Sequence, residues 1–269
     1  MVRAGRSRYV LRRFGTWRGA ADSLWEIELV TRLAALGLPV AAPLGPPRRV
    51  DGALHILMPF LAGRALGVGA VDEGRYRELG RHLADYHAAV ADLPPPPQRP
   101  GSCETVHGAL PMAGGAARRR ELLDALMGVD PRLARRFADA ADALHARDLP
   151  SLFAGAPRIV VQGDFAPWNI RLRGGRLVGL LDFELAHVDV RAADVAYARR
   201  GYHDAVVDGY LERASLSDAE LGSLDGLWLG GILAGTWRVL EDRLAEGSDL
   251  AYGMDWDLAQ LGKTRPYRG

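Results

Sequence analysis

Five short segments of the chain have the alternating or β-branched pattern that is typical of β-strands. They are residues 8–13, 54–60, 159–161, 170–173 and 176–181. Gly174 and Gly175 separate the last two, and such a glycine pair suits the positive φ of a tight hairpin turn. Pairing outward from that turn places Asn169 opposite Leu180, with Asp182 two residues further along on the same side.

Longer segments carry apolar residues at helical spacing. We expect helices over residues 23–36, 76–90 and 224–269, and one or two helices over 117–148. In the first, the apolar stripe places Glu26 on the inward face, whereas Glu28 points to water. Ser23 and Glu26 also have the spacing of a capping box, in which Glu26 would bond to the start of the helix. Both interpretations of Glu26 stay open.

The segments between these elements differ in composition. Residues 94–97 are four prolines and predict a stiff polyproline connector. Residues 98–116 are rich in Gly, Ala and Pro and are typical of a variable loop. His82 and His87 are five residues apart, not the four that would direct both to one metal ion, so we interpret them as ordinary helix residues. His187 is interpreted as a local hydrogen-bonding residue.

Composition excludes several kinds of protein. With 34 basic and 33 acidic residues among 269, the net charge is +1, which gives no general attraction to nucleic acid or to anionic membranes. No apolar window of about eighteen residues could span a bilayer. The single Cys103 cannot form an internal disulfide or a Cys-based zinc site, and indicates a reducing cytoplasm. A monomer and a homodimer both stay open.

Asp164, Asn169 and Asp182 form the most informative pattern in the chain. Phosphoryl transfer from a nucleotide requires a carboxylate that orients an attacking hydroxyl, and hard oxygen ligands that hold Mg²⁺ against the phosphates. The expected hairpin lets Asn169 and Asp182 reach one metal ion. Pro167 and Trp168 keep the segment between Asp164 and Asn169 an irregular loop.

The strings QGDFAPWNI and LLDFELAHVDVRAADVAYA resemble the catalytic segment of the aminoglycoside phosphotransferase and choline kinase-like superfamily, relatives of the protein kinases. This resemblance implies that Asp164 is the catalytic base, that Asn169 and Asp182 are Mg²⁺ ligands, and that Asp194 supports the lobe from the next helix. Gln162 stands where the family usually carries His. Its amide can still donate to and accept from nearby backbone, so we expect a modest effect.

Residues 8–13 resemble the third strand of the family's N-terminal lobe, which supplies a cation for the phosphates. Arg12 shares a face with Val10 and is the preferred candidate, while Leu11 points the other way into a small core. Arg13 is the second candidate. The only lysine is Lys263, so this role must fall to an arginine. By resemblance Arg12 pairs with Glu26.

Residues 37–66 resemble the stretch that leads to the hinge, where Met58, Phe60 and Leu61 would contact the adenine of ATP. A hairpin that covers the phosphates precedes the third strand in this family. Here only residues 2–7 precede it, enough for the end of one strand and a turn. We expect either a start further upstream or a protein that lacks this phosphate lid.

These patterns predict an α+β, two-lobed protein-kinase-like fold, with a short N-terminal lobe over residues 1–60 and a helical C-terminal lobe over 61–269. The expected activity is ATP- and Mg²⁺-dependent phosphorylation of a hydroxyl on a small molecule that the sequence does not identify. One alternative is a catalytically silent kinase-like binding protein. Another is a metal-dependent hydrolase that uses Asp164, Asp182 and Glu184, although Glu184 is better suited to a supporting role.

Overall fold

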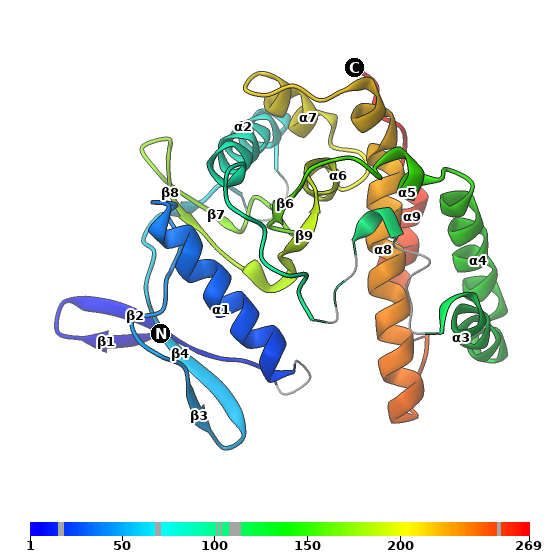
Figure 1. Cartoon of the computed structure of the whole chain (residues 1–269), viewed down its shortest axis with the longest axis horizontal. Coiled ribbons are helices and arrows are strands. Elements are labelled where there is room, and N and C mark those ends of the chain that lie inside the picture. The colour runs from blue at the N-terminus through cyan, green and yellow to red at the C-terminus, as the bar shows by residue number, and fades with distance from the viewer. Residues whose placement is uncertain (16–18, 68–70, 101, 103, 108–113, 252–253) are drawn as a thin grey trace.

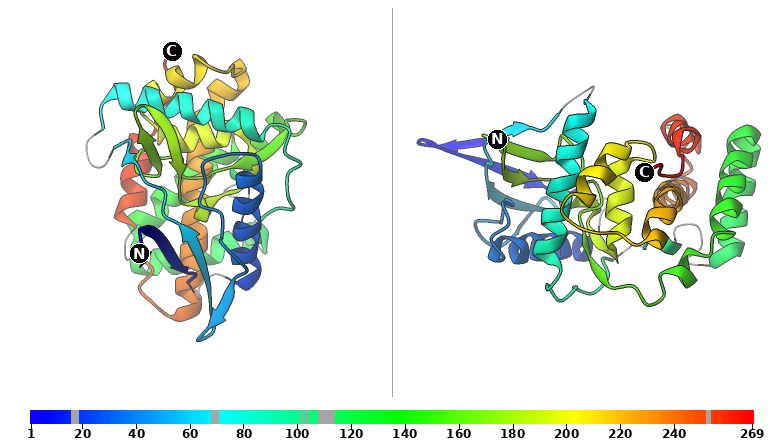
Figure 2. Two further views of the ribbon diagram at one scale, coloured as in Figure 1. Left: turned by 90° about the vertical axis from the view of Figure 1, so that its left-hand side faces the viewer. Right: turned by 90° about the horizontal axis from the view of Figure 1, so that it is seen from above.

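The computed structural model describes residues 1–15, 19–67, 71–100, 102, 104–107, 114–251 and 254–269. Part of the expected loop over 98–116 therefore lies outside the described residues. A small sheet with one helix occupies one end of the molecule, and α3, α4, α8 and α9 occupy the other (Figures 1 and 2). The fold is α+β and protein-kinase-like, as the sequence predicts.

The N-terminal sheet is antiparallel, with the strand order β1-β2-β4-β3. The strands are β1 (Val2–Ala4), β2 (Ser7–Arg13), β3 (Arg48–Val50) and β4 (Ala53–Pro59), and the helix after β2 is α1 (Ala20–Ala35). Gly5, at φ +58°, makes the turn between β1 and β2. The predicted strands over 8–13 and 54–60 are confirmed, as is the short strand and turn before them.

Leu11 does not enter a core. Its side chain is 54% exposed, and Leu57, its direct partner on β4, is 40% exposed. The other face of β2 carries Val10 and Arg12 toward a cavity and α1. Alternation along β2 correctly separated the two faces, but the prediction that Leu11 is buried was wrong because only one face is covered by the described residues.

The remainder of the chain is mainly helical. Its helices are α2 (Glu73–Val90), η1 (Thr105–His107), α3 (Gly115–Val129), α4 (Pro131–His145), α5 (Leu149–Leu152), η2 (Phe183–Leu185), α6 (Arg191–Arg199), α7 (Asp204–Leu211), α8 (Asp218–Glu246) and α9 (Asp255–Lys263). Residues 117–148 form two helices because Asp130 caps α4 through the amides of Arg132 and Leu133, with Pro131 at its first position.

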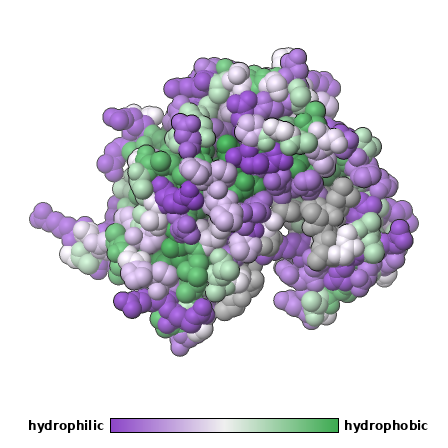
Figure 3. Space-filling view, in the orientation of Figure 1, coloured by the Kyte–Doolittle hydropathy of each residue, from purple (hydrophilic) through white to green (hydrophobic). Residues whose placement is uncertain are grey.

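Glycine allows two of these helices to approach closely. A Cβ on Gly80 of α2 would lie 2.0 Å from the carbonyl oxygen of Val206, and one on Gly209 of α7 would lie 1.9 Å from that of Arg77. Hydrophilic and hydrophobic residues are interspersed over the face shown in Figure 3. None of the helices in the described part of the chain combines the length and the apolar character that a membrane span requires.

Short strands carry the predicted catalytic segment. β6 (Arg158–Val161) pairs with β9 (His187–Val190), and β5 (Arg64–Ala65), β7 (Ile170–Arg173) and β8 (Arg176–Leu180) form a second small sheet. Arg173 pairs with Arg176 as predicted, but a bulge between Arg171 and Leu172 shifts the register by one residue. The prediction that Asn169 lies opposite Leu180 is therefore wrong. The carbonyl of Asn169 instead accepts from the amide of Leu181 at 2.9 Å, one residue nearer to Asp182.

Candidate active site

A cavity of about 660 Å³ lies between the N-terminal sheet and the hairpin of β7 and β8. Five of the eight predicted site residues line it: Arg12, Met58, Phe60, Leu61 and Asp182. Asp164 and Asn169 lie outside this lining but next to each other, and Glu26 lies behind Arg12. A larger cavity of about 970 Å³, bordered by α2 and α7, contains none of the predicted site residues.

Arg12 pairs with Glu26 and not with Glu28. The Nη1 of Arg12 donates to Oε1 of Glu26 at 2.6 Å, while Glu28 is exposed. The capping-box interpretation of Ser23 and Glu26 is wrong, because α1 begins earlier and has Gly19 as its N-cap. The pair places a guanidinium, 26% exposed, at the edge of the cavity, and β2 and α1 hold it there.

Asp164 lies in a network of hydrogen bonds. Its Oδ2 accepts from Nδ2 of Asn169 at 3.0 Å, and its Oδ1 accepts from Nη2 of Arg200 at 2.6 Å. The guanidinium of Arg200 stacks on the ring of Trp168, with its central carbon 4.5 Å from the ring centroid. These contacts fix the orientation of a carboxylate whose side chain is 28% exposed.

Burial and neighbouring charges act in opposite directions on the pKa of Asp164. Burial raises this pKa above the ordinary value, the charge of Arg200 lowers it, and the charge of Asp182 raises it again. The net shift is upward. A partly buried carboxylate with a raised pKa is a better proton acceptor than an ordinary one, which suits a general base.

Gln162 fixes the backbone on both sides of the site. Its Nε2 donates to the carbonyls of Leu181 and Asp182 at 3.0 and 2.6 Å, and its Oε1 accepts from the amide of Asp164 at 2.8 Å. The expectation that its amide donates to and accepts from backbone is confirmed. Asp182 has φ +58°, an uncommon conformation for a residue with a side chain, and these bonds hold it in place.

Asp194 supports the loop from beneath, as expected. It is completely buried at the start of α6, and its carboxylate accepts from the amides of Gln162 and Gly163 at 2.8 and 2.9 Å. Nε2 of His87 lies 3.3 Å from Oδ2 of Asp194, and Nδ1 of His87 contacts the hydroxyl of Tyr210. His187 makes the expected local hydrogen bonds, with the carbonyl of Leu185 and the carboxylate of Asp189, whereas both partners of His87 are distant in the sequence. The described residues contain no group of three His, Cys, Asp or Glu that could hold a metal ion.

The oxygen atoms at the site are suitable ligands for a Mg²⁺ ion that is shared with a nucleotide. Because Nδ2 of Asn169 donates to Asp164, the Oδ1 of Asn169 is left for a ligand, and the carboxylate of Asp182 lines the cavity. Mg²⁺ is usually bound by one or two carboxylates together with substrate phosphates and water, and in protein kinases an asparagine joins the aspartate as a protein ligand. A hydrolase with a ligand cluster formed by Asp164, Asp182 and Glu184 is not supported, since these three do not form such a group.

Sequence reasoning missed two arginines at the site. Arg200 follows α6 with φ +52° and contacts Asp164 directly. Arg99 lies in the segment predicted as a variable loop, yet it is 2% exposed and bonds to both α1 and η2. Arg200 is six residues after Asp194, a spacing that could have directed it toward the catalytic loop, whereas no local signal distinguishes Arg99 from other arginines.

Comparisons with known proteins identify relatives of this chain. The model of the phosphotransferase enzyme family matches residues 1–227. A protein of Deinococcus radiodurans is 30% identical, covering 87% of this chain and 73% of that protein. The homoserine kinase of Rhizobium johnstonii is 31% identical (79% and 67% covered), and that of Chelativorans sp. is 32% identical (70% and 55%). The chain thus spans little more than half of the Chelativorans enzyme.

Solved structures share the fold at lower sequence identity. A thermostable mutant of the aminoglycoside phosphotransferase APH(4)-Ia superposes with a TM-score of 0.65 at 18% identity, covering 97% of this chain and 87% of that one. The amicoumacin kinase hAmiN, in complex with AMP-PNP, Ca²⁺ and Ami, gives 0.62 at 15% identity, with 95% and 80% covered. A microcompartment-associated aminopropanol kinase gives 0.59 at 17%, with 91% and 89% covered.

Proposed function

Because the chain belongs to the phosphotransferase enzyme family, we propose that it transfers the γ-phosphate of ATP to a hydroxyl of a small molecule, with Mg²⁺ as the metal. The observation that carries this proposal is the cavity that joins Arg12, the hinge residues and Asp182, with Asp164 beside it. We include in the proposal the division into lobes near residue 60 and, from the single cysteine, a cytoplasmic location.

Each residue has a separate role in this proposal. Met58, Phe60 and Leu61 would contact the adenine, and Arg12, held by Glu26, would bind phosphate oxygens. Asn169 and Asp182 would hold Mg²⁺, which neutralises the charge of the phosphates when bound.

Asp164 would orient the acceptor hydroxyl and take its proton, and its raised pKa supports that role. Arg200 and Asn169 hold its two carboxylate oxygens, so that the base has one orientation before an acceptor arrives. A fixed orientation favours catalysis because less ordering is needed on the way to the transition state.

The acceptor that we propose is a short hydroxylated amino acid of the homoserine type. Identity to homoserine kinases is 28–32%, against 15–18% for the kinases with solved structures. The guanidinium beside Asp164 also suits a carboxylate on the acceptor better than a polycationic antibiotic. ADP release with L-homoserine, aminopropanol and hygromycin B as acceptors tests this choice. Preferential turnover of hygromycin B would contradict it.

Two substitutions test the assignment of the catalytic and metal residues. Asp164→Asn removes the base, and we expect turnover to fall by about 10²–10⁴-fold while MgATP still binds. Asp182→Asn removes a metal ligand and should weaken MgATP binding itself. Asp51→Asn, at an exposed turn, is the matched control.

The outcomes separate the kinase from its alternative. Normal turnover by Asp164→Asn would show that this residue is not the base. MgATP binding by the unaltered chain, without transfer to any acceptor and without hydrolysis, would favour the silent binding protein.

A further inference from the structure

The proline-rich segment between α2 and α3 is attached to α1. We call residues 94–99 the strap. The indole of Trp25 donates to the carbonyl of Pro97 at 2.8 Å, and Arg32 donates to the carbonyl of Pro94 at 2.8 Å. Both donors belong to α1, so the strap follows the helix that carries Glu26. A stiff polyproline segment suits this use because it loses little conformational freedom on docking.

The end of the strap is also attached to β9. The side-chain amide of Gln98 donates to the carbonyl of Val188 at 2.8 Å and accepts from its amide at 3.0 Å. The same Oε1 accepts from the amide of Arg99 at 3.0 Å. These bonds fix the backbone of Arg99 between α1 and the loop that follows Asp182.

The side chain of Arg99 contacts two carboxylates of α1. Its Nε and Nη2 donate to the two oxygens of Asp22, and its Nη2 lies 3.3 Å from Oε2 of Glu26. Since Oε1 of Glu26 accepts from Arg12, Glu26 is held between two guanidinium groups. Arg99 is 2% exposed and lies near the ring of Trp25, so these charges interact with little screening by water.

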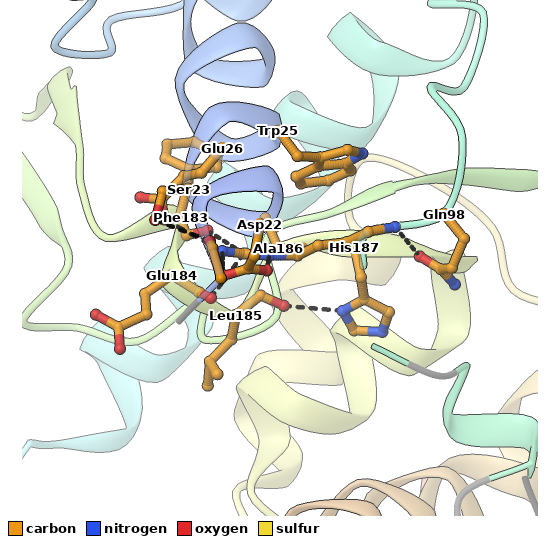
Figure 4. Close-up of polar contacts among 12 residues, drawn as sticks. Asp22, Ser23, Trp25, Glu26, Gln98, Phe183, Glu184, Leu185, Ala186 and His187 are labelled. Carbon is orange, nitrogen blue, oxygen red and sulfur yellow. Dashed lines mark hydrogen bonds and ion pairs between the residues drawn. The ribbon is translucent and has the colours of Figure 1, made fainter. Parts of the chain in front are cut away.

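The same guanidinium binds the turn that follows Asp182. Its Nη1 donates to the carbonyls of Phe183, Glu184 and Ala186 at 3.0, 2.7 and 3.1 Å. A short 3₁₀ helix such as η2 leaves carbonyls without helical partners, and Arg99 supplies a donor to them. Figure 4 shows Asp22 and Glu26 of α1 close to this turn, with dashed contacts converging between them.

We propose that Arg99 is a positioning residue for phosphoryl transfer, which links the Arg12–Glu26 pair to the loop that carries Asp182. One buried cation thereby sets the phosphate-binding side and the metal-binding side of the cavity relative to each other. This inference rests on the proposed function. It assigns a role to a segment whose composition indicated only a variable loop.

Two variants test the proposal in the whole chain. Arg99→Lys keeps the charge, but an ammonium cannot reach two carboxylates and three carbonyls at once. The double variant Arg99→Gln with Asp22→Asn removes one charge of each sign, so that the buried charge stays balanced if the lysine variant does not fold. Arg32→Gln is the control. Arg32 lies on α1, as Asp22 does, and it contacts the strap but not the loop that carries Asp182.

The first measurement uses nucleotide. Support behind a metal ligand is typically worth about 10–100-fold in metal affinity or activity, so we expect MgATP to bind that much more weakly to both Arg99 variants. The KM for the acceptor should change by less than about twofold, because Arg99 does not contact Asp164. Arg32→Gln should bind MgATP normally. Normal binding by both Arg99 variants would overturn the proposal.

The second measurement needs no nucleotide. Amide hydrogen exchange of the nucleotide-free chain should accelerate over residues 20–35 and 183–188 in the Arg99 variants before it does elsewhere. Uniform acceleration that follows the loss of thermal stability would show a merely structural role and would overturn the proposal. If the unaltered chain does not bind MgATP, the proposed function fails, while this measurement still decides whether Arg99 couples the two segments.

Discussion

We expect Glu26→Gln to lower the free energy of unfolding, by an amount that follows from the contacts of the Glu26 carboxylate. The carboxylate is 2% exposed and contacts Arg12 at 2.6 Å and Arg99 at 3.3 Å. Removing one partner of a buried ion pair costs about 3–5 kcal/mol. The low end applies here, because Arg99 keeps Asp22 as a partner and Arg12 is 26% exposed. We therefore expect a loss of about 3 kcal/mol.

This loss converts into a measurable change in melting temperature. An unfolding entropy of about 2.1 cal/mol/K per residue gives about 0.56 kcal/mol/K for this chain, so the midpoint should fall by roughly 5 °C. The assay is thermal unfolding followed by far-ultraviolet circular dichroism. Glu28→Gln, an exposed change on the same helix, should alter stability by less than about 0.5 kcal/mol.

A double-mutant cycle assigns the effect to the pair. Arg12→Met combined with Glu26→Gln should cost less than the two single changes together, with a coupling energy of about 1–3 kcal/mol. Equal melting temperatures for Glu26→Gln and Glu28→Gln would refute the reasoning, as would strict additivity of the two changes at Arg12 and Glu26.

Three further predictions concern the catalytic loop and the helical core. Arg200→Met should raise the pKa of Asp164 further, since the charge of Arg200 lowers it. The acid limb of the pH profile of kcat/KM should then move to higher pH, and a limb that stays in place or moves to lower pH would contradict this. Asp194→Asn replaces an acceptor of two backbone N–H groups by a group that has one acceptor oxygen, so about 1–3 kcal/mol should be lost in urea unfolding, together with turnover. Gly80→Ala inserts a methyl group 2.0 Å from a carbonyl oxygen of α7 and should destabilise the chain by about 1–3 kcal/mol or more. Gly235→Ala, where a Cβ meets nothing within 4 Å, should be neutral or slightly stabilising in the same unfolding assay.

Local patterns predicted the elements that carry the chemistry. The glycine pair at 174 and 175 identified the hairpin, and alternation along β2 placed Arg12 on the cavity side. The register nevertheless shifted, because β8 contains one more residue than β7 next to Gly179. The backbones are close there: a Cβ added to Gly179 would lie 2.9 Å from the Cβ of Arg171. Such a bulge depends on how side chains pack across the sheet, which hydrophobic periodicity does not report.

Contacts between distant segments were the least predictable part. Arg99 bonds to residues 73 to 87 positions away in the sequence, and the apolar patterns that predict helices and strands carry no information about such pairs. The wrong prediction for Leu11 has the same cause, because sequence patterns do not report tertiary contacts. Alternation separates two faces of a strand, but whether something covers a face depends on tertiary packing.

Arg12 supplies a guanidinium where this cavity needs a cation, and this determines which chemical probes can label the site. Lysine-directed acylating reagents carried by a nucleotide would find no lysine amine there, because the only lysine in the sequence, Lys263, belongs to α9 and contacts the ring of Tyr202. Acetylation of lysine likewise has no target at this position.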